Sequence, residues 1–183
     1  ENRFFPADTL VRAGLWARQN QQFIFSNQFL REHVYQGVQG PLKKQWHGQL
    51  AQYYEAQEPK PVWELAYHYF RSAEQDRALP YLLQCAEAQR TQFLPKESLH
   101  SLVQAVEIQR RRHEPDALSE TLFKVEELLD QLGDRYEQMK TIEEILELTG
   151  KSAGKNDFIR GLLRQANYCE RTSQYEASQA ICE

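Results

Sequence analysis

Apolar residues recur at helical spacing along most of the chain. From Ser26 onward they fall three or four residues apart, which places them on one face of a helix. The segment after Pro61 illustrates this with a stripe made of Val62, Leu65, Ala66, Tyr69, Phe70 and Ala73. The pattern predicts about ten helices, each roughly ten to seventeen residues long.

Proline, glycine and small polar residues mark the expected ends of these helices. Ser26 is predicted to be the N-cap of a helix that runs to about Gln36. Gly133 and Gly150 are predicted to end two later helices. Helices are expected to begin at Pro41, Pro95 and Pro115. In the first of these, the predicted apolar face consists of Trp46, Leu50, Tyr53 and Tyr54.

The first 25 residues differ from the rest of the chain. A short helix is expected to end near Gly14. The apolar segments 15–17 and 23–25 then flank a polar stretch, residues 18–22, which favours a small β-hairpin.

After this hairpin no strand pattern follows, so the predicted fold is all-α, with stacked antiparallel helical hairpins. A helical hairpin cannot bury its apolar face alone and needs neighbours. Two parts are predicted: residues 1–57, with the hairpin and a linking helix, and residues 58–183, with helical repeats that continue to the end of the chain.

Small residues recur at positions where paired helices would cross closely. Ala66 and Ala78 are twelve residues apart, and so are Ala166 and Ser178. This arrangement resembles degenerate tetratricopeptide repeats. Ser98 follows Ala78 after only twenty residues, whereas that repeat needs about 34, so irregular stacking is expected in the middle of the chain.

Residues 23–55 resemble a more specific family. The segments Phe23-Ile24-Phe25-Ser26-Asn27, Leu30-Arg31-Glu32 and Val34-Tyr35 are similar to the F-x-F-x-H-x-x-x-R-E-x-x-Y stretch of the STAND class of multidomain signalling ATPases, with Asn27 in place of the histidine. Gln45-Trp46-His47 and Ala66-Tyr67-His68-Tyr69 match the two helices that follow. The resemblance implies a winged-helix-like segment that leads into tetratricopeptide-like repeats, with a nucleotide-binding domain upstream. It also implies a bacterial protein that carries a further domain such as a cyclase, a kinase or a DNA-binding domain.

Composition narrows the possible functions. The chain is 41% hydrophobic and 26% charged with a net charge of −4, which argues against disorder and disfavours nucleic-acid binding as a general role. Three cysteines without a CxxC pair, Cys85, Cys169 and Cys182, indicate reduced thiols and a cytoplasmic protein. No apolar run approaches the roughly 20 residues that span a bilayer, so no membrane association is expected. The absence of an initiator methionine and the helical pattern at Glu183 predict a piece of a longer protein.

Candidate chemistry is sparse. The Gly150-Lys151-Ser152 segment lacks the earlier glycine of a phosphate-binding loop, because Ile145 occupies that position. No two histidines have the spacing of zinc ligands on one helix. We therefore predict no catalytic residue, no cofactor and no metal, and the chain is not expected to be an enzyme.

The acidic residues Glu126, Glu127, Asp130, Glu143, Glu144 and Glu147 are predicted to form a solvated face. For the basic run 110–113 we favour a helix C-terminus, with a phosphate or acidic-partner contact as the alternative.

Recognition is the remaining role. In tetratricopeptide proteins the first helix of each hairpin lines a concave groove, so the resemblance implies partner-binding positions on two such helices. These positions are Trp63, Tyr67, Arg71, Asn167, Glu170 and Arg171. The predicted function is a non-catalytic protein-interaction and regulatory scaffold that binds a protein or peptide, which includes the full-length protein's own ATPase or output domain. Two alternatives stay open: a regulatory fragment of a nucleotide cyclase, kinase or ATPase, and a DNA-binding winged-helix fragment that uses Lys43 and Lys44.

Overall fold

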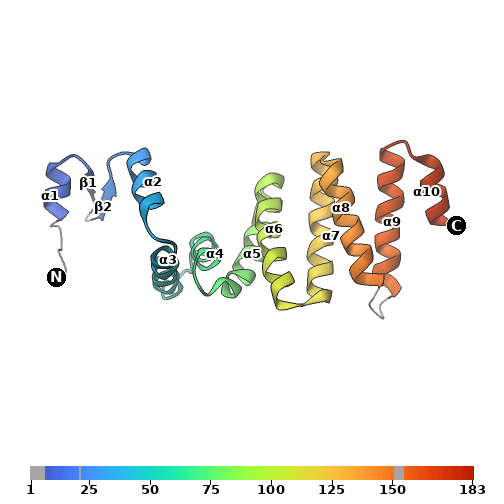
Figure 1. The fold of residues 1–183 in the computed structure, drawn as a ribbon, viewed down its shortest axis with the longest axis horizontal. Helices are drawn as coiled ribbons and strands as arrows, with labels where there is room; N and C mark the ends of the chain where they lie inside the picture. The colour runs from blue at the N-terminus through green and yellow to red at the C-terminus, as the bar shows by residue number, and fades with distance from the viewer. Residues whose placement is uncertain (1–6, 21, 151–154) are drawn as a thin grey trace. The chain divides into compact units, whose positions relative to one another are not determined.

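The computed structural model describes residues 7–20, 22–150 and 155–183 (Figure 1). They are mostly helical, with ten α-helices and one two-stranded sheet. The chain divides into two compact units, residues 1–46 and 47–183. The division falls inside a helix, earlier than the predicted boundary after residue 57. Among the described residues, no helix combines the length and apolar character needed to cross a membrane.

The first unit contains the predicted β-hairpin. Helix α1 (Ala7–Arg12) ends in a turn at Gly14, whose φ of +70° suits glycine. Strands β1 (Trp16–Gln19) and β2 (Gln22–Phe25) pair antiparallel, with Trp16 opposite Phe25. The expected hairpin is therefore confirmed, and its strands extend into the segment predicted to be a turn.

The cap of helix α2 (Gln28–Gly37) differs from the prediction by one residue. Asn27, not Ser26, caps the helix, and its side-chain oxygen accepts a 2.7 Å hydrogen bond from the Phe29 backbone N–H. The Ser26 backbone N–H still pairs with the Leu15 carbonyl of the hairpin, and its hydroxyl donates to the carbonyls of Gly14 and Leu15. Ser26 thus belongs to the hairpin and cannot cap the helix.

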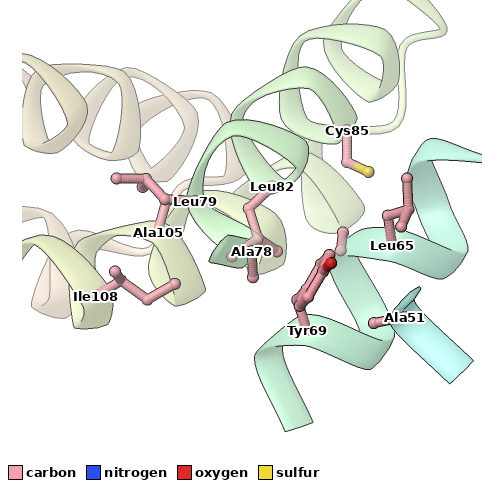
Figure 2. Packing of buried hydrophobic residues seen from close by; sticks show 10 residues of the cluster. Ala51, Leu65, Tyr69, Ala78, Leu79, Leu82, Cys85, Ala105 and Ile108 are labelled. Atoms are coloured by element: carbon pink, nitrogen blue, oxygen red, sulfur yellow. The ribbon is translucent and has the colours of Figure 1, made fainter. Parts of the chain in front are cut away.

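Helix α3 (Gly40–Glu55) starts in the first unit and continues into the second. Its buried residues are His47 and Ala51. Of the predicted apolar face, Trp46, Leu50 and Tyr53 are exposed, so the prediction was wrong for these three, whereas Tyr54 packs against the core cluster. Helix α4 (Val62–Arg71) packs Leu65 and Tyr69 of its predicted stripe into the same core cluster as Ala51, which lies one position after Leu50 on α3. The small Ala51 lets these large side chains approach (Figure 2).

The rest of the second unit is a series of helices, each of which packs against the next. These are α4 (Val62–Arg71), the 3₁₀ turn η1 (Gln75–Ala78), α5 (Leu79–Thr91), α6 (Pro95–Arg112), α7 (Pro115–Leu132), α8 (Arg135–Gly150), α9 (Lys155–Arg171) and α10 (Tyr175–Cys182). Pro95 and Pro115 lie in first turns, as expected, and so does Pro80. The loop of residues 151–154, which includes the Lys151-Ser152 pair considered above, lies outside the described residues.

The helices from α6 onward follow a strict spacing. They begin at Pro95, Pro115, Arg135, Lys155 and Tyr175, which is every 20 residues. The described turns also share one geometry, in which a left-handed residue follows the helix and two crossed hydrogen bonds close the helix end. At Gly133 (φ +75°), for example, the Gly133 N–H bonds to the Asp130 carbonyl and the Asp134 N–H to the Leu129 carbonyl. Two helices thus take 40 residues, more than the roughly 34 of a tetratricopeptide repeat.

Burial follows the same 20-residue spacing. The same position of four successive helices is apolar and buried in each case: Leu82, Leu102, Leu122 and Ile142. The position one residue earlier is buried in each helix from α6 to α9, and it holds a small residue each time: Ser101, Thr121, Thr141 and Gly161. The small positions allow close helix approach, while the large ones fill the core between helices.

The acidic face predicted on α7 is not fully solvated. Glu126 is buried with 2% of its surface exposed, because α7 packs against α6 and α8 and Arg164 of α9 reaches its carboxylate. Gln138 donates a 2.7 Å hydrogen bond to Glu126 Oε1, and the Arg164 Nε lies 3.4 Å from Oε2. The prediction of a solvated carboxylate was therefore wrong for Glu126, whose charge has partners within the protein.

The basic run at the end of α6 connects several elements. Arg110 binds Glu144 of α8 through two nitrogens, at 2.8 and 2.5 Å. Arg111 lies 3.8 Å from Asp76 of η1, and Arg112 pairs with Glu114 in the following turn. These arginines already have acidic partners in the second unit.

Candidate functional site: a groove on helices α4 to α6

Three of the predicted recognition residues lie together in one groove. Trp63, Tyr67 and Arg71 of α4 line a depression of about 490 Å³ between α4, α5 and α6. Leu82 and Cys85 of α5 add an apolar part, and His100 and Gln104 of α6 form its other side. The groove combines exposed aromatic rings with basic and amide groups.

Helix α4 places these side chains by its periodicity. Positions 63, 67 and 71 are four residues apart and share one face, while Leu65 and Tyr69 on the other side are completely buried. Trp63 and Tyr67 are 46% and 47% exposed. One face of α4 thus anchors the helix, and the other remains open to a ligand.

Arg71 stacks on Tyr67. Its guanidinium carbon lies 3.8 Å from the centre of the Tyr67 ring, and its Nη1 donates a 3.4 Å hydrogen bond to the Tyr67 carbonyl. This cation–π arrangement holds the guanidinium over an aromatic surface. The two side chains thus form a single preformed edge of the groove.

A pair of histidines lies next to this edge. The Nδ1 atoms of His47 and His68 are 2.8 Å apart, a hydrogen bond in which one imidazole donates and the other accepts. The Tyr54 ring stacks on His68 at 5.5 Å, and Tyr67 meets His47 edge-on at 5.7 Å. His47 belongs to α3 and His68 to α4, so no spacing rule within one helix reveals the pair.

Both histidines favour the neutral form. Burial is the main cause that lowers the pKa of His47 to about 4, with further contributions from His68 and Arg71. The pKa of His68 is also lowered, mainly by burial and then by Arg71, while Glu64 opposes the shift. A neutral pair satisfies the short nitrogen–nitrogen contact, because protonation of both rings would place two hydrogens between the same two atoms.

The groove offers little chemistry beyond binding. Burial raises the pKa of Cys85 to about 11, so its thiol remains protonated and a poor nucleophile near neutral pH. Among the described residues, no group of three or more histidine, cysteine or acidic side chains is arranged to hold a metal ion.

A polar cluster holds α4 in position. Glu55 of α3 accepts 2.6 Å hydrogen bonds from the Tyr69 hydroxyl and from Arg77, and a 3.3 Å bond from Tyr81 of α5. The Tyr69 hydrogen bond, followed by Arg77, lowers the pKa of Glu55. This cluster connects α3, α4, η1 and α5.

The second predicted set lies elsewhere. Asn167, Glu170 and Arg171 are exposed on α9, and none of them lines the α4–α6 groove. Arg171 pairs with Asp130 of α7 at 3.2 Å. The structure thus brings together the three predicted residues of α4 and places the three of α9 on a separate surface.

The sequence comparisons give no relative from which a role could be transferred. No protein-family model matches the chain, and no curated protein is significantly similar to it.

Proposed function

We propose that the chain is a non-catalytic protein-interaction module that captures a peptide segment of a partner in the α4–α6 groove. The observation that supports this most is the open face of α4, where Trp63, Tyr67 and Arg71 line one depression. Tryptophan, tyrosine and arginine are the residues that most often dominate binding energy at interfaces.

The architecture favours such a role. We propose that the second unit is a helical-repeat scaffold related to tetratricopeptide hairpins, with longer helices that give two-helix units of 40 residues. In stacked helices of this kind, each neighbour buries the face of the next, so a groove is rigid before binding. A preformed groove avoids part of the ordering entropy that binding otherwise costs.

The resemblance of residues 23–55 to STAND-class proteins supports a place for the module in a larger signalling protein. In that setting the first unit is a winged-helix-like connector, and the partner segment belongs to the ATPase, to an output domain or to a second protein. Binding in the groove would then shift the full-length protein between closed and open states.

Peptide display tests the groove. Random dodecapeptides are selected on the 183-residue chain at pH 7, and their affinities are measured by fluorescence anisotropy. We expect selected peptides to bind the Trp63→Ala/Tyr67→Ala variant at least ~10-fold more weakly, since two anchor rings are lost. Tyr136→Ala and Tyr175→Ala, which remove exposed rings at 69% and 67% exposure on other helices, are the matched controls. Unchanged binding to the double variant, or no selected peptide, would contradict the proposal.

A further inference from the structure

Arg71 differs from the other arginines of the second unit. In residues 47–150 and 155–183 it is the arginine with no carboxylate within ion-pair distance, although Glu64 lies in the same groove. The arginines that have such partners are Arg77, Arg90, Arg110, Arg111, Arg112, Arg135, Arg160, Arg164 and Arg171. The chain has more acidic than basic residues, so this unmatched charge is unusual within it.

The contacts that Arg71 does make leave most of its hydrogen-bonding capacity unused. A guanidinium has five N–H donors, and the described residues accept one bond from it, at the Tyr67 carbonyl. The Tyr67 ring holds its planar group in place at 3.8 Å. A guanidinium that is fixed and partly buried, with free donors, is the group best suited to bind a carboxylate through two parallel hydrogen bonds.

The electrostatics of the groove agree with an unmatched positive charge. Arg71 lowers the pKa of both His47 and His68, which means that its charge acts across the site. Glu64 opposes this effect at His68 with a smaller contribution than Arg71. The Arg71 end of the groove therefore has a positive potential that an anionic ligand group would neutralise.

We infer that the groove binds a peptide segment with an aspartate or glutamate side chain against Arg71 and an apolar side chain against Trp63 and Tyr67. This inference rests on the function proposed above and adds the chemistry of the partner. It follows from the unpaired guanidinium, its fixed position on Tyr67 and the exposed rings on the same helix face.

The position of Glu64 predicts a second preference in the peptide, at a defined distance from its acidic residue. Glu64 precedes Arg71 by seven residues on α4, which corresponds to about 10 Å along the helix axis. An extended peptide covers that distance in about three residues. We therefore expect the acidic residue to be followed or preceded, about three positions away, by a basic or polar residue and not by a second acid.

Substitutions on α4 test this inference on the selected dodecapeptides. We expect the peptides to be enriched in Asp and Glu, and Arg71→Gln to weaken their binding at least ~10-fold, since a charge-assisted bidentate pair is lost. Glu64→Gln should strengthen binding roughly 3-fold by removing a repulsive charge. Arg90→Gln, which removes an exposed arginine paired with Glu87 on α5, is the matched control and should bind as the original chain does.

The pH dependence of binding provides a second readout. A carboxylate at Arg71 would cancel the charge that disfavours protonated His68, whose pKa is lowered from 6.5 by burial and then by Arg71, so affinity should rise as the pH falls below 6.5. The other titratable groups near the pair are Tyr54, Glu64, Tyr67, Cys85 and His100. This increase should disappear in Arg71→Gln, whose fold is checked by its circular dichroism melting curve.

Three outcomes separate this inference from the proposed function. Peptides without acidic enrichment that bind Arg71→Gln normally, but not Trp63→Ala/Tyr67→Ala, overturn the inference and leave the groove function standing. Peptides that bind Arg71→Gln and Trp63→Ala/Tyr67→Ala as tightly as the original chain overturn both the inference and the proposed function. Acidic peptides that bind Arg90→Gln as weakly as Arg71→Gln would show general charge attraction and also overturn the inference.

Discussion

The short contact between His47 and His68 makes their protonation part of the folded structure. Only one of the two Nδ1 atoms can carry the hydrogen that joins the rings at 2.8 Å. His47 has 6% of its surface exposed, and its pKa in the folded state is about 4, against an ordinary value of 6.5. The pair therefore connects stability to pH at the point where α3 meets α4.

The sign of this effect is defined by the lowered pKa. Below pH 6.5 the unfolded chain takes up a proton at His47 before the folded chain does, so stability is complete above pH 6.5 and falls toward pH 4. At about 1.4 kcal/mol for each pKa unit, the loss should approach ~3 kcal/mol over that window. His47→Gln should reduce the loss, measured by urea unfolding at pH 7 and pH 5.

His113→Asn is the matched control for this prediction, because His113 is exposed and its left-handed conformation tolerates asparagine. It should leave the pH dependence of the unfolding free energy unchanged. If the unfolding free energy of His47→Gln fell as much between pH 7 and pH 5 as that of the original chain, the buried pair would not be the cause of the fall.

Glu126 shows the opposite pH behaviour. Burial raises its pKa above 4.5, so the folded state prefers the protonated form, and stability falls as the pH rises through the shifted pKa. Its Oε2 has no hydrogen bond to any described residue and lies 3.4 Å from the Arg164 Nε. Glu126→Gln should therefore be neutral or stabilising by up to ~1 kcal/mol at pH 8, measured by urea unfolding.

Removal of the partner of Glu126 should have the reverse effect. Gln138→Leu leaves the buried carboxylate without its 2.7 Å donor and should cost about 2 kcal/mol. If Glu126→Gln lowered the unfolding free energy more than Gln138→Leu does, the ion pair of Glu126 with Arg164 would stabilise the fold more than its geometry indicates.

At the scale of elements, close helix contacts give two helical glycines different roles. A Cβ at Gly161 would lie 2.9 Å from Leu146 and 3.2 Å from Ile145, which is fully buried on α8. A Cβ at Gly48 would meet only Ser72, at 3.8 Å. Gly161 is therefore required for the approach of α9 to α8, and Gly48 is not required for packing.

Alanine substitutions should separate these roles. Gly48→Ala should raise the unfolding free energy by about 1 kcal/mol through helix propensity. Gly161→Ala should give no gain or a loss, because the buried Ile145 cannot move aside freely. Thermal melting followed by circular dichroism compares the two, and an equal gain at both positions would contradict the close contact.

At the scale of the whole molecule, the helices of the second unit pack in sequence order, so perturbations should stay local. Leu122 is 2% exposed in the second core cluster, whereas the groove depends on the first. Leu122→Ala should cost about 2–4 kcal/mol. Hydrogen exchange followed by mass spectrometry should accelerate in α6 to α8 more than in α4. Uniform acceleration across the second unit would indicate a single cooperative core.

Much of this architecture could be predicted from the sequence. Several features follow from residue types that control backbone conformation locally. These are the hairpin near Trp16, the helix starts at Pro95 and Pro115, and the helix end at Gly133. The exposed face of α4 could also be predicted, because Trp63, Tyr67 and Arg71 fall outside its apolar stripe. The 20-residue spacing of Leu82, Leu102 and Leu122 was present in the sequence too, but a search for 34-residue repeats does not find it.

Other features were decided only by tertiary packing. The buried face of α3, the burial of Glu126 and the contact of His47 with His68 each depend on which neighbouring helix lies opposite. Among the arginines of residues 47–150 and 155–183, Arg71 is distinguished only because the others have acidic partners, often on other helices, and it does not. Sequence patterns report neighbours within one helical turn, so they determine where helices form and which faces are apolar. Which polar groups meet across helices depends on packing between distant segments, and local spacing carries no information about it.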